Sequence, residues 1–347
     1  MPWTPAAGIT GLPGIPFKVL KRIILLATGG TIASVRQEAG FPLVPGMSAR
    51  DLLSFVPQIQ TLCDPSARDI MDLDSSNIQP EEWQLIAREI FAALDTYDGV
   101  VVTHGTDTLS YTASMISYML HGLDKPVIFT GAQLPISDLM SDGRRNLECA
   151  FGAAVNGAPG VYVVFDNQII SGTRSTKLYS MGFNAFASIN AAAAGTIDSR
   201  GIVFRSPPEI KKGERRLLDA ICPDVILIKI IPGTKPELFD AAMSLGYRGV
   251  VIEAFGVGGM HFIHRNLVEK VAMLCERDIL VLVISQCLYD SIDFSRYEAG
   301  SRLPSRIISG MDMTTEAAVT KLMWALGQGT TPDEAAALMR TAICGEF

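Results

Sequence analysis

Short runs of valine, isoleucine and leucine recur along this chain, and longer stretches with apolar residues at helical spacing separate them. Strands that consist of continuous apolar runs are typical of parallel sheets that helices cover on both faces. The pattern therefore predicts a doubly wound α/β fold with a mostly parallel sheet. The expected strands are residues 19–27, 99–103, 127–130, 160–165, 225–231, 249–253 and 279–285, and the expected helices are 80–93 and 111–120.

A stretch rich in proline and charge interrupts this alternation after residue 198. It contains Pro207, Pro208 and the run KKGERR, a composition typical of a connecting segment. A chain of 347 residues is also longer than one core usually supports. We therefore expect a larger N-terminal α/β domain over 20–200, a linker over 201–221 and a smaller α/β domain over 222–347.

Charge and hydropathy narrow the classes of function. The net charge is −7 and no long basic tract is present, which argues against a nucleic-acid partner. No apolar run reaches the roughly 18 residues that a membrane span needs. The first 17 residues lack the basic and apolar regions of a signal peptide. We expect a cytoplasmic protein, without a membrane partner, that acts on a small polar molecule.

The cysteines and histidines are not spaced as metal ligands. The six cysteines show no CxxC spacing, which favours buried thiols over a disulfide framework or a metal site. His261 and His264 form a close pair without a third ligand nearby, so a packed or surface pair is favoured over a metal site. We expect no metal and no organic cofactor.

Polar residues follow two of the predicted strands, where a doubly wound sheet binds its ligands. The first strand leads into TGGT (28–31), in which two glycines permit a sharp turn and a close approach before the hydroxyl of Thr31. The strand at 99–103 leads into THGTDT (103–108), which holds Thr106 and Asp107. A turn residue and a helix cap are the ordinary interpretations of these two loops.

Lys177 adds a third group at the end of GTRSTK (172–177), in the loop region after the strand at 160–165. A lysine beside a threonine and an aspartate suits activation of a hydroxyl. The carboxylate orients the ammonium, and a lysine whose pKa is lowered by burial can accept the threonine proton.

Together these motifs resemble the bacterial-type L-asparaginases, and more closely their cytoplasmic type I branch. The resemblance covers nearly everything from about residue 20 onward. It implies an L-asparaginase that converts L-asparagine to L-aspartate and ammonia through a threonine acyl-enzyme, without a cofactor. The segments that carry it are ATGGTIAS (27–34), MDLDSSNIQPEEW (71–83), THGTDT (103–108), TGAQLPISDLMSDGRRNL (130–147), GTRSTK (172–177), MGFNAFASIN (181–190) and GMDMTTEAAVTKLMWAL (310–326).

The resemblance also implies roles for single residues. Thr31 is similar to the nucleophile of the family, and Thr106, Asp107 and Lys177 resemble the group that supports the chemistry. Tyr297 resembles a type I residue that a neighbouring subunit contributes, which implies a homo-oligomer, either a dimer or a tetramer. The positions that match substrate-binding residues are Asp74, Ser75 and Ser76 near the α-carboxylate end, Thr106, Asp107 as the partner of the α-ammonium, Ala132 through its backbone, and Tyr297.

One position departs from the pattern of the family, which usually has a tyrosine shortly after TGGT that helps to deprotonate the nucleophile. Here the segment GFPL (40–43) offers Phe41, and no tyrosine lies between Thr31 and Trp83. Either the loop aligns differently or another group removes the proton, so the general base for Thr31 stays open.

Two other functions remain open. An archaeal-type tRNA-dependent amidotransferase subunit uses a similar domain to release ammonia from glutamine, but such subunits carry an extra N-terminal domain. A non-catalytic amino-acid-binding protein on the same scaffold is the second alternative. Phe41 favours it, whereas the intact Thr31, Thr106, Asp107 and Lys177 argue against it.

Overall fold

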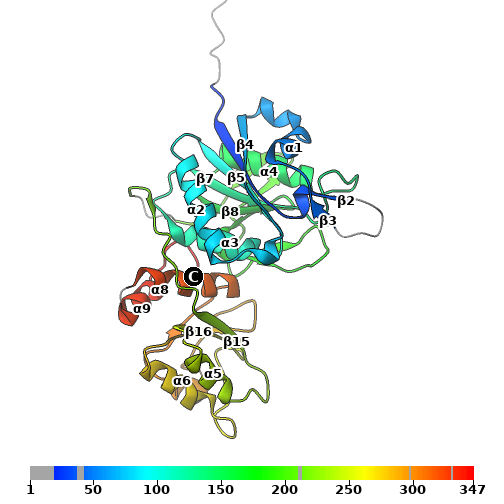
Figure 1. The fold of residues 1–347 in the computed structure, drawn as a ribbon. Helices are drawn as coiled ribbons and strands as arrows, with labels where there is room; N and C mark the ends of the chain where they lie inside the picture. Colours follow the sequence, from blue (N-terminus) through cyan, green and yellow to red (C-terminus); the bar gives the residue numbers. More distant parts are fainter. Residues whose placement is uncertain (1–18, 37–42, 210–212, 297, 330) are drawn as a thin grey trace, which may run out of the picture.

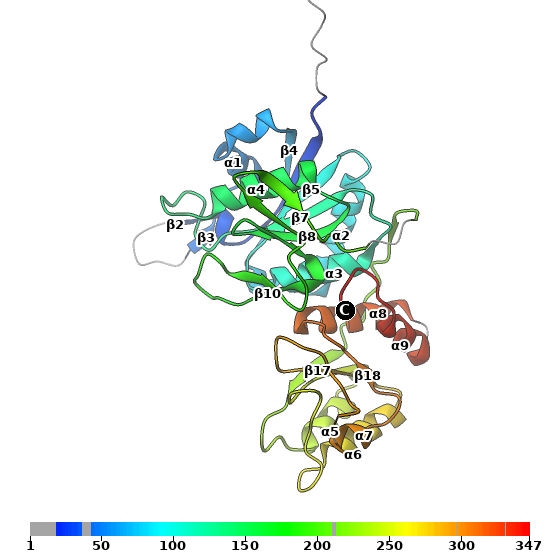
Figure 2. The same ribbon diagram turned by 180° about the vertical axis from the view of Figure 1, so that it is seen from behind.

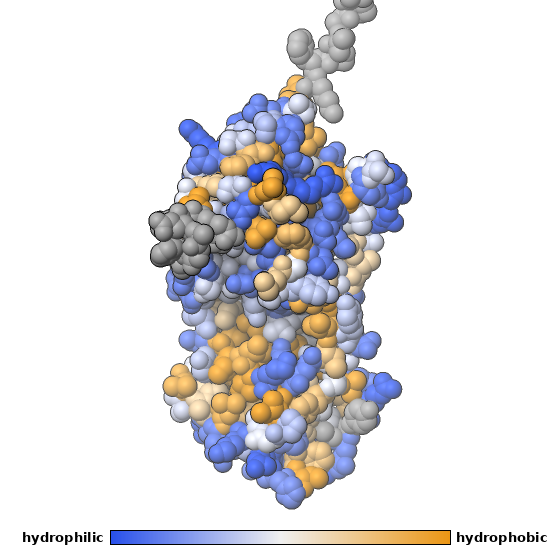
Figure 3. All heavy atoms as spheres, turned by 90° about the vertical axis from the view of Figure 1, so that its right-hand side faces the viewer, coloured by the Kyte–Doolittle hydropathy of each residue, from blue (hydrophilic) through white to orange (hydrophobic). Residues whose placement is uncertain are grey.

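The computed structural model describes residues 19–36, 43–209, 213–296, 298–329 and 331–347. These residues form two α/β units, which lie one above the other in Figure 1 and, from behind, in Figure 2. The N-terminal unit comprises β1 to β13, and the C-terminal unit comprises β15 to α9. In side view the molecule narrows between them, and hydrophobic patches lie on the surface of the lower part (Figure 3).

The N-terminal unit is built, within the described residues, on a sheet of eight strands in the order β13-β12-β9-β8-β7-β5-β1-β4. The strands from β4 to β8 in this order run parallel, and β9, β12 and β13 extend the sheet antiparallel. Their bounds are β1 (Arg22–Gly29), β4 (Asp64–Leu73), β5 (Gly99–Thr103), β7 (Pro126–Thr130), β8 (Gly160–Phe165), β9 (Gln168–Ser171), β12 (Gly195–Asp198) and β13 (Gly201–Phe204).

The strand order reverses at β1. The chain passes from β1 to β4 on one side and then returns to β5 on the other side, from where β7 and β8 follow outward. Such a reversal separates the connections at the carboxyl ends of the two central strands and leaves a crevice where doubly wound proteins bind ligands. The ends of β1 and β5 carry the TGGT and THGTDT motifs.

Alternate residues of the central strands are buried on opposite faces of the sheet. Ile24 and Leu26 pack in one apolar cluster, and Ile23 and Leu25 pack in another, all at most 1% exposed. This confirms the prediction of a parallel sheet covered on both sides. Figure 1 shows α2 and α3 on one face and α4 on the other. The helices are α2 (Pro80–Ala93) and α3 (Leu109–Met119), and α1 (Ala49–Ser54) and α4 (Gly143–Asn156).

The C-terminal unit holds a parallel sheet of four strands within the described residues, in the order β15-β16-β17-β18. Helices α5 and α6 pack on one face through a separate apolar cluster, and α8 contacts the other face. The bounds are β15 (Val225–Lys229), β16 (Gly249–Ala254), β17 (Leu280–Ser285), β18 (Ile308–Ser309), α5 (Glu237–Ser244), α6 (Leu267–Glu276), α7 (Glu298–Ser301), α8 (Thr315–Gln328) and α9 (Pro332–Arg340).

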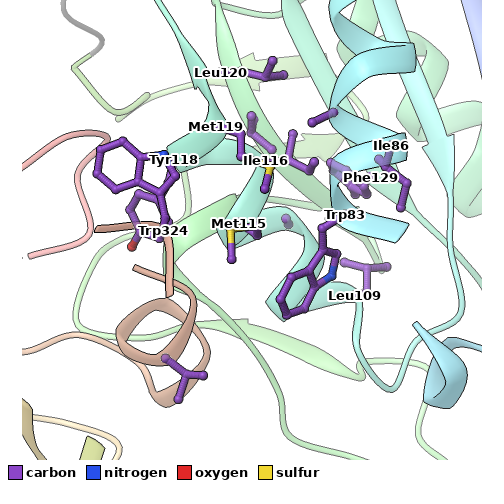
Figure 4. Close-up of a cluster of buried hydrophobic side chains, with 14 of the residues drawn as sticks. Trp83, Ile86, Leu109, Met115, Ile116, Tyr118, Met119, Leu120, Phe129 and Trp324 are labelled. Atoms are coloured by element: carbon purple, nitrogen blue, oxygen red, sulfur yellow. The ribbon is translucent and has the colours of Figure 1, made fainter. Parts of the chain in front are cut away.

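Helix α8 joins the two units, because its second face packs on α3 of the N-terminal unit. Tyr118 of α3 and Trp324 of α8 lie with ring centroids 6.1 Å apart, and both side chains are buried (Figure 4). One apolar cluster therefore runs from the large sheet through α3 and α8 to the small sheet. Since this contact is a continuous core, we expect the units to hold a fixed relative position.

The predicted elements are confirmed closely where apolar runs are uninterrupted. The predicted strands 99–103 and 160–165 match β5 and β8, and the predicted helix 80–93 matches α2, which has Pro80 in its first turn. The first strand begins later than predicted and runs on to Gly29. The remaining short elements are β2 (Ser34–Arg36), β3 (Leu43–Pro45), β6 (Leu120–His121), β10 (Ser175–Lys177), β11 (Phe186–Ser188), β14 (Arg216–Leu217) and the 3₁₀ helices η1 (Thr31–Ala33), η2 (Pro57–Thr61), η3 (Ser75–Asn77) and η4 (Gly172–Arg174).

The structure differs from the predicted linker, 201–221, at both of its ends. Gly201–Phe204 forms β13, which pairs with β12 and so belongs to the large sheet. Arg216–Leu217 forms β14, which pairs with β6 of the N-terminal unit. Both strands are short and only partly buried, so they lack the long apolar runs that marked the central strands.

The thiols largely follow the prediction. Four of them are buried, Cys287 is exposed and Cys344 is half-buried. The buried four are Cys63, Cys149, Cys222 and Cys275. None of the six forms a disulfide within the described chain. Among the described helices, none is both long enough and apolar enough to cross a bilayer.

Candidate active site

The loops after β1 and β5 touch through their backbones. Gly29 and Gly30 have φ angles of 97° and 81°, which residues with a side chain rarely adopt. The two glycines turn the chain so that Thr31 begins η1. A Cβ at Gly30 would lie 2.5 Å from the Cα of Gly105. Only glycine therefore fits this contact, which brings the TGGT and THGTDT motifs together at the reversal of strand order.

The end of β4 lies against the same loops. The N–H of Gly30 donates to the carbonyl of Leu73 over 3.1 Å, and the hydroxyl of Thr108 donates to the carbonyl of Ser75 over 2.7 Å. A Cβ at Gly105 would lie 2.6 Å from Ser75 Oγ. The loops after β1, β4 and β5 thus form one contiguous surface.

Asp74 and Ser76 flank the buried Ser75 and are exposed. Oδ1 of Asp74 accepts hydrogen bonds from the backbone N–H and the hydroxyl of Ser76, at 2.8 and 2.7 Å. These hydrogen bonds hold the pKa of Asp74 below its usual value, since they favour the ionised carboxylate. Asp74 also caps the short helix η3, which fixes the position of both serines.

Lys177 brings the predicted polar group together. Its Nζ donates to Thr106 Oγ1 over 2.7 Å and to Asp107 Oδ1 over 2.6 Å. The lysine side chain is 15% exposed, whereas that of Asp107 is 66% exposed. Because the Lys177 ammonium is mostly buried, its hydrogen bond to the buried Thr106 is strong. The carboxylate of Asp107 is accessible to a ligand.

Gln133 contacts the candidate site, although the sequence pattern did not predict it. Thr106 Oγ1 donates to Gln133 Oε1 over 3.2 Å, and Gln133 Nε2 donates to the carbonyl of Gly182 over 3.0 Å. The hydroxyl of Thr106 therefore donates a hydrogen bond to Gln133 and accepts one from Lys177. The position of Gln133, directly after the predicted residue Ala132 at the end of β7, was the signal that could have identified it.

Ala132 lies in the same loop and is buried. Two neighbouring backbone N–H groups, of Gln133 and Leu134, donate to the carboxylate of Asp142. The N–H of Ile136 donates to the carbonyl of Ile32 over 3.1 Å, which ties this loop to η1. The loop after β7 thus completes the surface that begins at Thr31.

His104 points away from this surface and is fully buried. Its Nδ1 donates to the carbonyl of Gly105 over 2.8 Å, and its Nε2 lies 2.9 Å from the hydroxyl of Thr112. Burial lowers the pKa of His104 to about 4, because an imidazolium would lose its hydration. The histidine is neutral near pH 7, and it supports the loop rather than serving as a base in the site.

Two predicted positions, Phe41 and Tyr297, lie outside the described residues. The proposed roles of the ring after TGGT and of a tyrosine from a neighbouring subunit therefore stay predictions. Within the described chain, no group of three or more histidine, cysteine, aspartate or glutamate side chains is arranged to hold a metal ion.

Two family models match the chain. The family model "Asparaginase, N-terminal" matches residues 22–210, and the model "Glutaminase/Asparaginase C-terminal domain" matches residues 224–339. The chain belongs to the asparaginase family. The two matches cover both α/β units, so the family resemblance expected from the motifs is confirmed over almost the whole chain.

Individual relatives of this asparaginase-family chain support the same assignment. The L-asparaginase of Thermococcus kodakarensis is 41% identical over 94% of this chain and 99% of its own, and its solved structure superposes with a TM-score of 0.88. L-asparaginase 1 of Escherichia coli K12 is 35% identical over 94% of this chain and 98% of its own. A glutamyl-tRNA(Gln) amidotransferase subunit of Pyrococcus furiosus is also 35% identical, over 96% of this chain and 78% of its own.

Alanine at Gly30 tests the backbone contact between the loops. Gly246 is a control for a positive φ, because its φ of 80° is within a degree of that of Gly30 but a Cβ there would meet nothing within 4 Å. Gly246→Ala should cost only about 1 kcal/mol of unfolding free energy and spare amidohydrolase turnover. Gly30→Ala should lower turnover at least about a hundredfold, because the loops must move apart by an ångström or more. Equal turnover in the two purified variants would contradict a role for the close contact.

The burial of His104 predicts a pH dependence of stability. Its pKa is about 4 in the folded chain against 6.5 for the free group, so the unfolded chain binds more protons between these values. Stability is therefore lost as pH falls from 6.5 toward 4, by up to about 3 kcal/mol. Urea unfolding at several pH values should show this loss, and His104→Gln should remove it. A resonance assigned to the His104 imidazole that titrates near pH 6.5 in the folded protein would contradict the prediction.

Proposed function

We propose that this asparaginase-family amidohydrolase hydrolyses the side-chain amide of L-asparagine to L-aspartate and ammonia, through an acyl-enzyme on Thr31. The observation that carries the proposal is the pair of hydrogen bonds from Lys177 Nζ to Thr106 and Asp107, made beside the TGGT loop. A hydroxyl, an ammonium and an accessible carboxylate are brought together where a doubly wound sheet binds its ligand. Release of ammonia from L-asparagine is the direct test.

In the first step, the hydroxyl of Thr31 attacks the amide carbon of the substrate. A C–O bond forms, the carbonyl oxygen becomes an oxyanion, and backbone N–H groups of the turn stabilise this charge. The C–N bond then breaks. The hydroxyl proton passes to the leaving nitrogen, so ammonia departs and a β-aspartyl ester remains on Thr31.

In the second step, water attacks the ester carbon. When Lys177 is unprotonated, it can accept the proton of Thr106 across their 2.7 Å hydrogen bond, and Thr106 can then accept a proton from water. The new C–O bond forms and the ester bond to Thr31 breaks. The threonine oxygen takes up the proton that water released, so Lys177 is again unprotonated. The carboxylate of Asp107 orients the lysine throughout.

The polar groups around this point fit the two ends of an α-amino acid. The exposed carboxylate of Asp107 suits the α-ammonium. The family pattern assigns the α-carboxylate to the loop of Asp74, Ser75 and Ser76, where a ligand would compete with Asp74 for the hydroxyl and N–H of Ser76. The backbone of Ala132 would then face the side-chain amide. These assignments follow the family pattern for positions that lie on one contiguous surface.

Hydrolysis of glutamine is the second candidate function. The 35% identity to the glutamyl-tRNA(Gln) amidotransferase chain favours it, although this chain spans 78% of that relative. Parallel assays of L-asparagine and L-glutamine separate the candidates. Ammonia from glutamine alone would favour the amidotransferase function, and ammonia from neither substrate would favour an amino-acid-binding protein.

The cytoplasm is the compartment that we propose. All six cysteines are free thiols within the described structure, including the exposed Cys287. Disulfide-free proteins with accessible thiols are typical of a reducing compartment.

Replacement of Thr31 tests the nucleophile. Thr31→Ala should fold normally, because the side chain lies at the start of a surface turn and is only partly buried. Turnover of L-asparagine should fall at least about a thousandfold, the scale expected when a covalent nucleophile is removed. Near-normal ammonia release by a folded, pure variant would exclude Thr31 from this role.

Replacement of Lys177 tests the supporting group. Lys177→Met keeps most of the side-chain volume but removes the donor to Thr106 and Asp107. We expect turnover to fall about a hundred- to ten-thousandfold, the range of general acid–base catalysis, with an unchanged melting temperature. If the variant instead unfolds, and an independently stabilised version is active, Lys177 serves as a structural ion-pair partner.

We expect a homo-oligomer whose subunit interface lies next to the site. The hydrogen bonds of Gln133 tie the loop after β7 to the segment at 179–182, and both regions expose large apolar side chains. These side chains, Leu139, Met140, Tyr179 and Met181, suit burial against another subunit. Light scattering at assay concentration should give at least a dimer, and an active monomer would contradict this.

A further inference from the structure

The short segment that carries Lys177 belongs to the N-terminal unit, but residues of the C-terminal unit hold it. This segment, residues 172–177, comprises η4 and β10. Thr173, Arg174 and Ser175 are buried, although they lie at the border between the two units. Figure 2 shows β10 beside the junction with α8. The position of the lysine therefore depends on contacts across this border.

Arg174 makes the strongest of these contacts. Its Nε donates to the carbonyl of Gly345 over 2.8 Å, and one terminal nitrogen donates to the carbonyl of Asp312 over 3.3 Å. The same nitrogen lies 3.1 Å from the carboxylate of Asp312. The guanidinium side chain is 7% exposed, so its planar donors are fixed by acceptors on two different segments.

The residues on either side of Arg174 reach the same unit. Thr173 Oγ1 donates to the carbonyl of Cys344 over 3.4 Å, and Thr176 Oγ1 donates to the carboxylate of Glu316 over 3.1 Å. Burial raises the pKa of Glu316, but the threonine hydroxyl can donate to either protonation state of its acceptor oxygen. The side chains of Thr173, Arg174 and Thr176 thus hold the backbone immediately before Lys177 against the C-terminal unit.

The segment 341–347 presents the carbonyls that accept from Thr173 and Arg174. Lys321 of α8 pairs with Glu346 at 2.5 Å, and neither side chain is exposed to solvent. The Glu346 carboxylate also accepts from the N–H groups of Ile343 and Cys344, and Lys321 donates to the carbonyl of Thr341. These bonds close the segment into a compact turn with a defined position on α8.

The hydrogen-bond partners of Lys177 itself, Thr106 and Asp107, do not hold it equally firmly. Asp107 is largely exposed, and exposed ion pairs contribute little to holding a side chain in one place. Thr106 is buried, but it binds the end of a long flexible side chain. The start of that side chain is set by the backbone after Arg174.

We propose that Arg174 is a positioning residue for Lys177, and that Asp312 and the segment 341–347 are its anchor on the C-terminal unit. The inference rests on the proposed function, in which Lys177 takes part in proton transfer. Through these contacts, the C-terminal unit sets the distance between Lys177 Nζ and Thr106 Oγ1 in the N-terminal unit of the same chain. Misplacement of a catalytic group by about 1 Å lowers turnover by about a hundredfold.

The test compares Arg174→Ala and Arg174→Lys with Arg215→Ala. Arg215 is a control, because this partly buried guanidinium likewise contacts carboxylate and backbone carbonyl oxygens. Its acceptors are the carboxylates of Asp95 and Asp124 and the carbonyl of Leu94. Arg174→Ala should lower kcat for L-asparagine ten- to a hundredfold, with KM changed less than about threefold. Guanidinium chloride at millimolar concentration should restore part of the lost kcat, and Arg174→Lys should lie between. Arg215→Ala should show neither the loss nor the rescue.

Asp312→Asn covers the case in which Arg174→Ala does not fold. It keeps the shape and the carbonyl acceptors but removes the charge that faces Arg174, so kcat should fall severalfold at unchanged KM. Wild-type kcat in folded Arg174→Ala or Asp312→Asn would overturn the proposal, as would a loss that guanidinium does not relieve. A wild-type protein that releases no ammonia from L-asparagine would instead overturn the proposed function, before any variant is compared.

Discussion

The contact between the backbones of Gly30 and Gly105 is the constraint on which the site depends. A side chain on either residue would collide, at 2.5 Å with Gly105 itself or at 2.6 Å with Ser75. Because the strand order reverses at β1, no helix connection passes between the ends of β1 and β5, and the loops can approach this closely. The fold thus determines where the loops meet, and the glycines determine how near.

The continuous core across the two units gives this local contact its rigidity. Helix α8 packs on α3 with one face and on the small sheet with the other, so Tyr118 and Trp324 share one cluster. The border between the units therefore behaves as an interior rather than as a surface contact. A polar anchor such as that of Arg174 is effective only on a rigid neighbour, since an anchor that moved with a hinge would not hold Lys177 in place.

The sequence predicted what uninterrupted patterns encode and missed what depends on tertiary contacts. Central strands such as β5 and β8 were predicted to the residue, because burial on both faces leaves a continuous apolar run. The strand β13 was assigned to a linker, because a short, half-exposed edge strand carries no such run. Thr106, Asp107 and Lys177 were predicted by motif, whereas the contacts that Gln133 and Arg174 make with them or with their segment emerge only from hydrogen bonds to distant parts of the chain.

The buried pair of Lys321 and Glu346 fixes the segment on which Arg174 is anchored. Burial alone lowers the pKa of Lys321, and the attraction of Glu346 opposes that shift. A paired charge at zero exposure adds little net stability, but removal of one partner leaves the other uncompensated, at a cost of about 3 to 5 kcal/mol. The pair therefore specifies one position of the segment 341–347 rather than strengthening the core. Lys177 is held differently, because its own ion-pair partner Asp107 is 66% exposed and the firm contacts lie in the backbone segment before it, at Arg174.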